Sequence, residues 1–143
     1  MKKLIFLIFL SFFFVASANA FFWNKKLQPS LFFTSTDPRI AISYDEKIEN
    51  HSVFKIGQRI YFLVYNPQGF KSDYIKYQVI KQDDNAHIGG FSRIRNVVKR
   101  VSDKNYYIDY IVLSEAGKYA LQIFDIENLH QWIIYGHFRV VEE

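Results

Sequence analysis

The stretch SEAGKYALQIF, residues 114–124, decides the fold of this chain. Gly117 permits a sharp turn, and after it the apolar side chains of Tyr119, Leu121 and Ile123 occupy every second position. A period of two is typical of a β-strand with one buried face, whereas an amphipathic helix repeats every 3.6 residues. The stretch therefore predicts a turn followed by a strand at a sheet surface.

Similar runs, separated by turn residues, follow one another along the chain. The run 73–81 alternates apolar and polar residues clearly, and 91–101 is a charged run that we interpret as an edge strand or a bend. The predicted strands are 39–44, 58–65, 73–81, 91–101, 105–113, 118–126 and 131–141. Short strands at this spacing without a convincing helix predict an all-β fold, a single antiparallel β-sandwich of about seven strands.

The order of residues around the turn resembles the tyrosine corner of the immunoglobulin-like superfamily, with Glu115, Gly117, Tyr119 and Leu121 in the matching positions. The resemblance covers 37–143. It implies that Gly117 turns the chain between two sheets, and that the Tyr119 hydroxyl bonds to backbone upstream while its ring enters the core.

Two features depart from antibody domains. The chain has no cysteine, so Leu121 stands where the second disulfide cysteine would be, and Tyr77 stands in place of the central tryptophan. Ten Tyr, two Trp and the ten Phe that follow residue 20 supply large rings instead. We expect their burial to replace a disulfide, which is worth about 2–4 kcal/mol.

The N-terminus has the features of a secretory signal peptide. Lys2 and Lys3 precede an apolar run over 4–15, and Ala18 and Ala20 form an A-x-A cleavage site. We expect export, most plausibly to a bacterial periplasm, with an extracellular location as the alternative. An uncleaved membrane anchor is the other interpretation, but the run is shorter than the roughly 20 residues of a membrane span.

Three parts of the chain are thus expected: a signal peptide over 1–20, an apolar segment over 21–36, and the immunoglobulin-like domain over 37–143. The apolar segment includes Phe22 and Trp23. A segment of this composition either packs on its own domain or docks on a partner. After cleavage we expect no further membrane contact.

Charge excludes one class of partner. Without Lys2 and Lys3, 16 basic residues face 14 acidic ones. A nearly neutral chain gives no electrostatic reason to expect nucleic acid as a ligand. The oligomeric state stays open.

No pattern points to catalysis, a metal or another cofactor. The chain has no cysteine and no G-x-S-x-G motif, and the loop residues Asp83 and Asp84 lack the alternating oxygen ligands of a calcium loop. Metal-ligand spacing is also absent from the four histidines, His51, His87, His130 and His137. We therefore expect no enzyme, with a small hydrolase that uses unmarked carboxylates as an alternative.

Clustered charge marks a candidate partner site at Arg93, Arg95, Lys99 and Arg100. Because Arg93 and Arg95 are two residues apart, a regular strand would point both to one side. Such a cluster either binds an acidic partner, an anionic glycan or a lipid head group, or it protects an edge strand against pairing.

We interpret the chain as an exported, non-catalytic binding module that engages another protein of the cell envelope. The cationic run and the segment with Phe22 and Trp23 are its candidate contacts. The alternative is a carbohydrate-binding module in which exposed rings form a stacking platform, with Tyr74, Trp132 and Tyr135 as the candidates.

Overall fold

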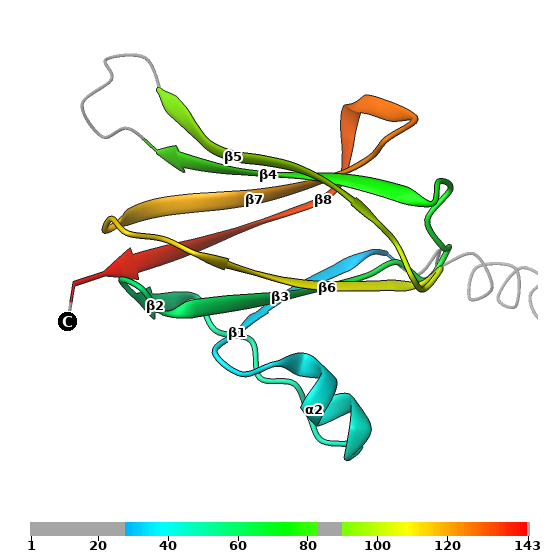
Figure 1. The fold of residues 1–143 in the computed structure, drawn as a ribbon, viewed down its shortest axis with the longest axis horizontal. Helices are drawn as coiled ribbons and strands as arrows, with labels where there is room; N and C mark the ends of the chain where they lie inside the picture. The colour runs from blue at the N-terminus through cyan, green and yellow to red at the C-terminus, as the bar shows by residue number, and fades with distance from the viewer. Residues whose placement is uncertain (1–27, 83–89, 143) are drawn as a thin grey trace, which may run out of the picture.

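A computed structural model describes residues 28–82 and 90–142. These residues form two sheets packed face to face as a β-sandwich (Figure 1). The three-stranded sheet has the order β1-β3-β6 and the five-stranded sheet the order β2-β8-β7-β4-β5. Their elements are β1 (Ser30–Thr34), α2 (Pro38–Ser43), β2 (Val53–Lys55), β3 (Arg59–Tyr65), β4 (Tyr74–Gln82), β5 (Phe91–Arg100), β6 (Tyr106–Val112), β7 (Gly117–Asp125) and β8 (Asn128–Val141).

The core lies between the sheets and is built from the apolar face of each strand. Ile60, Leu121 and Ile123 are fully buried there, so the period of two in the sequence corresponds to one buried face per strand. Phe62 of β3 meets Tyr77 of β4 edge to face, with 5.1 Å between ring centroids. This contact joins the two sheets through rings, as the composition predicted.

The predicted corner is present. Tyr119 is 3% exposed, and its hydroxyl donates a hydrogen bond of 2.8 Å to the carbonyl oxygen of Glu115. Its ring stacks on Phe138 of β8 at 5.6 Å between centroids. Leu121, in the position of the missing cysteine, is fully buried. Packing of large side chains thus occupies the place of the disulfide.

Gly117 begins β7 with φ +156°, a conformation that side chains rarely adopt. A Cβ atom at this position would lie 2.7 Å from Cε of Lys81. The Lys81 ammonium is bound to the Glu115 carboxylate at 2.6 Å, which lies next to the turn. The predicted requirement for glycine therefore has both a conformational and a steric cause.

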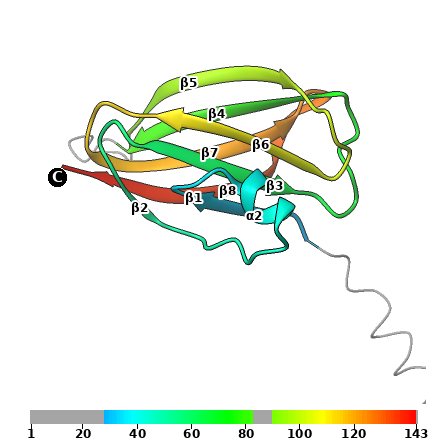
Figure 2. The ribbon, with the colours of Figure 1, turned by 60° about the horizontal axis from the view of Figure 1, so that its bottom comes forward.

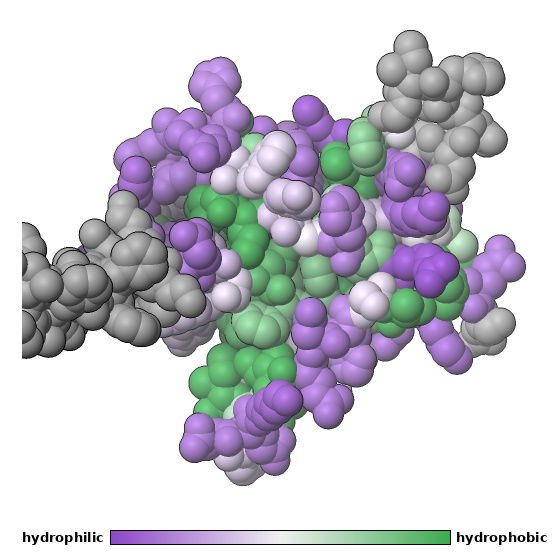
Figure 3. All heavy atoms as spheres, turned by 180° about the vertical axis from the view of Figure 1, so that it is seen from behind, coloured by the Kyte–Doolittle hydropathy of each residue, from purple (hydrophilic) through white to green (hydrophobic). Residues whose placement is uncertain are grey.

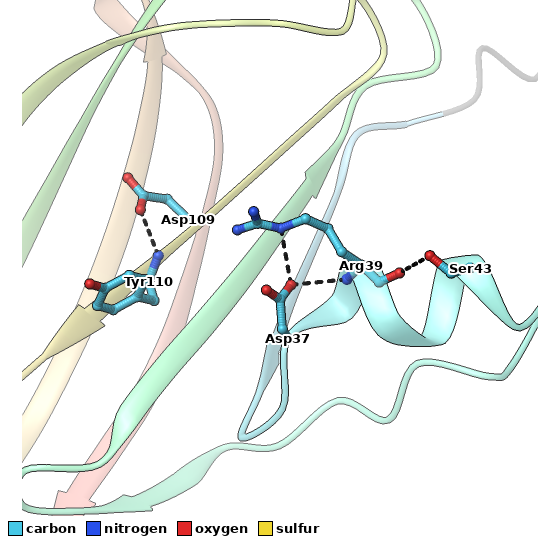
Figure 4. Close-up of polar contacts among 5 residues, drawn as sticks. All are labelled: Asp37, Arg39, Ser43, Asp109 and Tyr110. Carbon is cyan, nitrogen blue, oxygen red and sulfur yellow. Dashed lines mark hydrogen bonds and ion pairs between the residues drawn. The ribbon is translucent and has the colours of Figure 1, made fainter.

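The prediction of a strand over 39–44 was wrong, because these residues belong mostly to helix α2. Asp37 is its N-cap and Pro38 occupies the first turn, a start signal that outweighs the alternation of Ile40 and Ile42. The Asp37 side chain accepts hydrogen bonds from the backbone N–H and the side-chain Nε–H of Arg39 (Figure 4). The helix projects from the sandwich in Figure 1 and faces the viewer in Figure 2, and its Ile40 and Ile42 are 57% and 49% exposed.

Two strands that we did not predict bring the total among the described residues to eight. β1 lies within the apolar segment 21–36, pairs with β3 and buries Phe33. β2 pairs in parallel with the end of β8, and is the exception in an otherwise antiparallel sandwich. Outside the described residues lie the predicted signal peptide with Ala18 and Ala20, and the apolar residues Phe22 and Trp23.

β1 also packs across the sandwich against β8. At Gly136 a Cβ atom would lie 2.8 Å from Cε2 of Phe33 and 2.9 Å from Cδ2 of Leu31. Phe33 in turn contacts the ring of Phe138 at 5.0 Å. Gly136 is therefore needed for the close approach of these two strands. Among the described residues, no helix has the length and apolar character to cross a membrane.

Candidate binding surface on the five-stranded sheet

Positive charge is concentrated in one of the two sheets. The strands of the five-stranded sheet contain nine basic residues and one acidic residue, Asp125. Asp125 is 7% exposed and accepts hydrogen bonds from the backbone N–H groups of Lys71 and Glu127. Its charge is therefore engaged inside the fold, and the basic side chains of this sheet meet no acidic side chain from its own strands.

The strand register assigns most of these basic residues to the sheet face that points away from the core. Lys118 of β7 lies directly opposite Arg139 of β8, and Lys76 of β4 shares this face. We call this surface the cationic face; its basic residues are Lys55, Lys76, Arg93, Arg100, Lys118 and Arg139.

A β-bulge divides the predicted basic cluster of β5. Arg95 pairs with the inward-facing Val79 and Arg93 with the outward-facing Ile80, so that Ile94 is inserted between them. The two arginines therefore lie on opposite faces of the sheet, and our expectation that they share one side was wrong. Arg93 and Arg100 belong to the cationic face. Arg95 and Lys99 lie on the opposite face of β5, which is the inner face of the five-stranded sheet.

Three exposed rings accompany the basic residues on this face. Trp132 and Tyr135 of β8 are 47% and 49% exposed, and Tyr74 of β4 is 47% exposed. Trp132 meets Tyr135 at 5.3 Å with an angle of 73° between planes, and Tyr135 meets His137 at 86°. The rings along β8 thus form an edge-to-face row, not a coplanar platform.

A hollow of about 520 Å³ opens at the end of the cationic face where β2, β8 and β7 meet. The charged side chains of Lys118 and Arg139 line it, together with His137. Apolar atoms of Val53, Phe91, Ala120 and Phe138 and the polar residues Ser52, Gln82 and Tyr119 complete the lining. The described residues that line the hollow include no carboxylate, so this part of its wall suits an anionic group.

Another polar cluster lies inside the sandwich and is structural. Asp109 Oδ2 accepts hydrogen bonds from the hydroxyls of Tyr77 (3.2 Å) and Tyr107 (2.9 Å), and its Oδ1 accepts from the backbone N–H of Tyr110 (Figure 4). Burial, reinforced by the negative charge of Asp109, raises the pKa of Tyr77 to about 12. Burial and the bond to Asp109 also raise the pKa of Tyr107. Both hydroxyls therefore stay neutral at physiological pH.

The described residues contain no group of three side chains that would hold a metal ion. His51 lies 4.0 Å from the Glu49 carboxylate near β2, and His130 is exposed at the start of β8. His87, Asp83 and Asp84 lie outside the described residues.

Sequence reasoning missed Lys76, Lys118, His137 and Arg139 as members of one surface. Each follows the period of two within its own strand, and this alternation was a usable signal. What could not be predicted was the order of strands that brings β4, β7 and β8 side by side.

The sequence matches no protein-family profile and no curated protein. Solved structures with some similarity include an uncharacterized protein from Bacillus anthracis str. Ames, at 17% identity and TM-score 0.45, covering 64% of this chain and 77% of that chain. The PmoD soluble domain from Methylocystis sp. ATCC 49242 has 11% identity and TM-score 0.48, covering 79% and 90%. The CARDB domain of a Pyrococcus furiosus protein, in complex with di-metal ions, has 15% identity and TM-score 0.40, covering 81% and 90%. All three TM-scores are below 0.5, and we infer no function from them.

Proposed function

We propose that this chain is an exported, non-catalytic binding module of the bacterial cell envelope, most plausibly periplasmic, that engages another protein through the cationic face. Its membership of the immunoglobulin-like superfamily is part of the proposal and is supported by the hydrogen bond from Tyr119 to Glu115. The observation that carries the binding function is the charge of the cationic face, which holds six of the nine basic residues in the strands of the five-stranded sheet and no acidic residue from these strands.

The composition of the face fits a protein partner. Aromatic and arginine side chains are enriched in protein interfaces, and here Trp132, Tyr135 and Arg139 lie on the same face of one strand. Clustered positive charge accelerates association with an acidic partner and makes it sensitive to salt. Without Lys2 and Lys3 the chain is nearly neutral, with 16 basic and 14 acidic residues, so this attraction is local to one surface.

Crosslinking in intact cells of the source organism, followed by mass spectrometry, tests the proposal. The double variant Lys118→Glu/Arg139→Glu reverses charge on the cationic face, whereas Arg95→Glu/Lys99→Glu makes the same change on the inner face of β5. We expect the first variant to lose its crosslinked partners and the second to keep them. Recovery of the same partners from both variants would contradict a role for the cationic face.

Carbohydrate binding is the second candidate, favoured by the shared face and half exposure of Tyr74, Trp132 and Tyr135. The angle of 73° between Trp132 and Tyr135 lets only one of these two rings stack on a given sugar face. A Trp132→Ala variant distinguishes the candidates in affinity electrophoresis with envelope polysaccharides. Retardation that disappears in this variant but persists in Lys118→Glu/Arg139→Glu would favour the carbohydrate.

A further inference from the structure

Three of the four sheet edges carry features that oppose pairing with another strand. β5 has four basic residues and the bulge at Ile94. β6 points the charge of Asp109 inward, and β1 is only five residues long. On β1, the N–H and C=O groups of Phe33 are bonded to the side chain of Asn50 and the N–H of His51. Charges, bulges, short length and coverage are the usual protections of a sheet edge.

The fourth edge, on β8, has none of these protections over 134–138, because the irregular part of its register, with the extra residue Ile133, lies before this stretch. β2 pairs with β8 only over 139–141, and the strand contains no Asp, Glu, Lys or Arg from 128 to 138. The N–H of Arg139 donates to the Ser52 carbonyl at 2.8 Å, so the backbone groups of this residue point to the β2 side. By alternation, the N–H and C=O groups of Tyr135 and His137 point to the same side, where no described strand pairs with them.

We propose that the free edge of β8 over 134–138 takes an extended segment of the partner protein as an additional strand, and that the side chains of this segment alternate between apolar and acidic. The inference rests on the proposed function and names the chemistry of its partner. Backbone hydrogen bonds to Tyr135 and His137 would give the affinity, as in other cases of strand addition.

The surroundings of β8 determine why apolar and acidic side chains should alternate in the added strand. Side chains of an added strand that point inward would meet Leu31 and the neighbouring apolar residues of β1, and apolar side chains do gather on this side of the molecule (Figure 3). Side chains that point outward would extend the cationic face beside Tyr135, His137 and Arg139. The inward positions therefore favour apolar residues, and the outward positions favour carboxylates.

A second copy of this chain fits the edge less well. Antiparallel pairing of two β8 strands about a twofold axis would join both cationic faces into one surface on the same side of a continuous sheet. That surface would hold two sets of basic residues with no acidic residue from the strands. Repulsion between the two sets opposes this arrangement.

A short synthetic peptide that alternates valine and glutamate is the probe, and its affinity is measured by fluorescence anisotropy. Tyr135→Pro removes the ring together with an N–H that points to the free edge, where proline is tolerated, and Tyr135→Ala removes the ring but keeps the N–H, so the difference between the two variants isolates the hydrogen bond. Loss of one hydrogen bond, about 1–1.5 kcal/mol, predicts roughly tenfold weaker binding for Tyr135→Pro. We expect a smaller change for Tyr135→Ala, no binding of a valine–lysine peptide, and slowed amide exchange at Tyr135 and His137 in the complex.

Wild-type affinity in Tyr135→Pro, equal binding of the lysine peptide, or unprotected amides at Tyr135 and His137 would each overturn the inference. If Tyr135→Pro does not fold, the wild-type protein is tested instead with a valine–glutamate peptide whose backbone amides are N-methylated along one edge. Unchanged affinity for this peptide would also overturn the inference. A dimer of the unliganded protein with these amides already protected would also overturn it. If Lys118→Glu/Arg139→Glu loses its cellular partners while Tyr135→Pro keeps them, the cationic face stands and strand addition fails.

Discussion

The hydroxyl of Tyr119 on β7 donates a hydrogen bond of 2.8 Å to the carbonyl oxygen of Glu115, four residues upstream at the turn between the sheets. This bond ties the turn to the core, because the same ring stacks on Phe138. The pKa of Tyr119 is raised, mainly by burial, so the hydroxyl remains a donor in neutral solution.

Replacement of Tyr119 by Phe should lower the free energy of unfolding by about 1–3 kcal/mol, because it leaves the Glu115 carbonyl without its partner. Urea denaturation measures this loss. Tyr106→Phe is the matched control, since its ring is 41% exposed and its removal of a hydroxyl should cost less than about 0.5 kcal/mol. A loss of only a few tenths of a kcal/mol in Tyr119→Phe would mean that the corner does not stabilise the fold.

Gly136→Ala should destabilise the protein by about 1–3 kcal/mol, since the added methyl group would overlap Phe33 and Leu31. Thermal unfolding of the single variant and of Gly136→Ala/Leu31→Ala gives the test. Removal of the Leu31 branch makes room for the methyl group, so the two changes should cost less together than the sum of their separate effects. Strictly additive costs would show that Leu31 does not limit the space at Gly136.

Alkaline solution should destabilise the fold through Tyr77 and Tyr107. Tyrosine ionises near pH 10 in an unfolded chain, whereas the pKa of Tyr77 is raised to about 12 by burial and that of Tyr107 is raised as well. The unfolded state therefore releases protons that the folded state retains. The stability from these groups is complete below about pH 10 and is lost as the pH rises through the folded pKa values.

Urea midpoints measured from about pH 9 to pH 12 test this expectation. Tyr77→Phe should make the alkaline decline shallower, because the residue that resists ionisation is gone. An identical slope in Tyr77→Phe and wild type would contradict the role of its buried hydroxyl.

Asp37→Ala should loosen helix α2 with little effect on the whole domain. An N-cap is worth about 1 kcal/mol to its helix, but α2 projects from the sandwich and its loss leaves the core intact. Amide exchange at Ile40 and Tyr44 should accelerate in Asp37→Ala. Asn also serves as an N-cap, so Asp37→Asn should keep the protection while it loses the ion pair with Arg39. Equal acceleration of amide exchange in both variants would show that loss of the ion pair, and not loss of the N-cap, causes the effect.

Local pattern predicted the six strands β3 to β8, and its failures have physical causes. Over 39–44, Ile40 and Ile42 alternate as they would in a strand, but Asp37 and Pro38 begin a helix and leave both side chains in solvent. β2 is three residues long and depends on parallel pairing with β8, which is far away in sequence. Pairing between strands so far apart in the sequence produces no recognisable pattern in the residues of β2 itself.

The candidate surface was predicted only in part. Of the proposed contacts, Arg93 and Arg100 lie on the cationic face, whereas the bulge places Arg95 on the other side. A bulge depends on how β5 pairs with β4, and its charged sequence carries no sign of the extra residue. Net charge was also misleading, since acidic residues in loops conceal the imbalance within the strands.

The unequal width of the two sheets has a consequence for how this chain can vary. β5 borders only β4 and lies at the end of the five-stranded sheet, with nine of its ten residues exposed. Apart from Val97, which packs against the core, its residues can be replaced without displacing core atoms, so new residues are tolerated there as long as β4 keeps a neighbour. β5 is thus the strand on which related proteins have the greatest freedom to diverge.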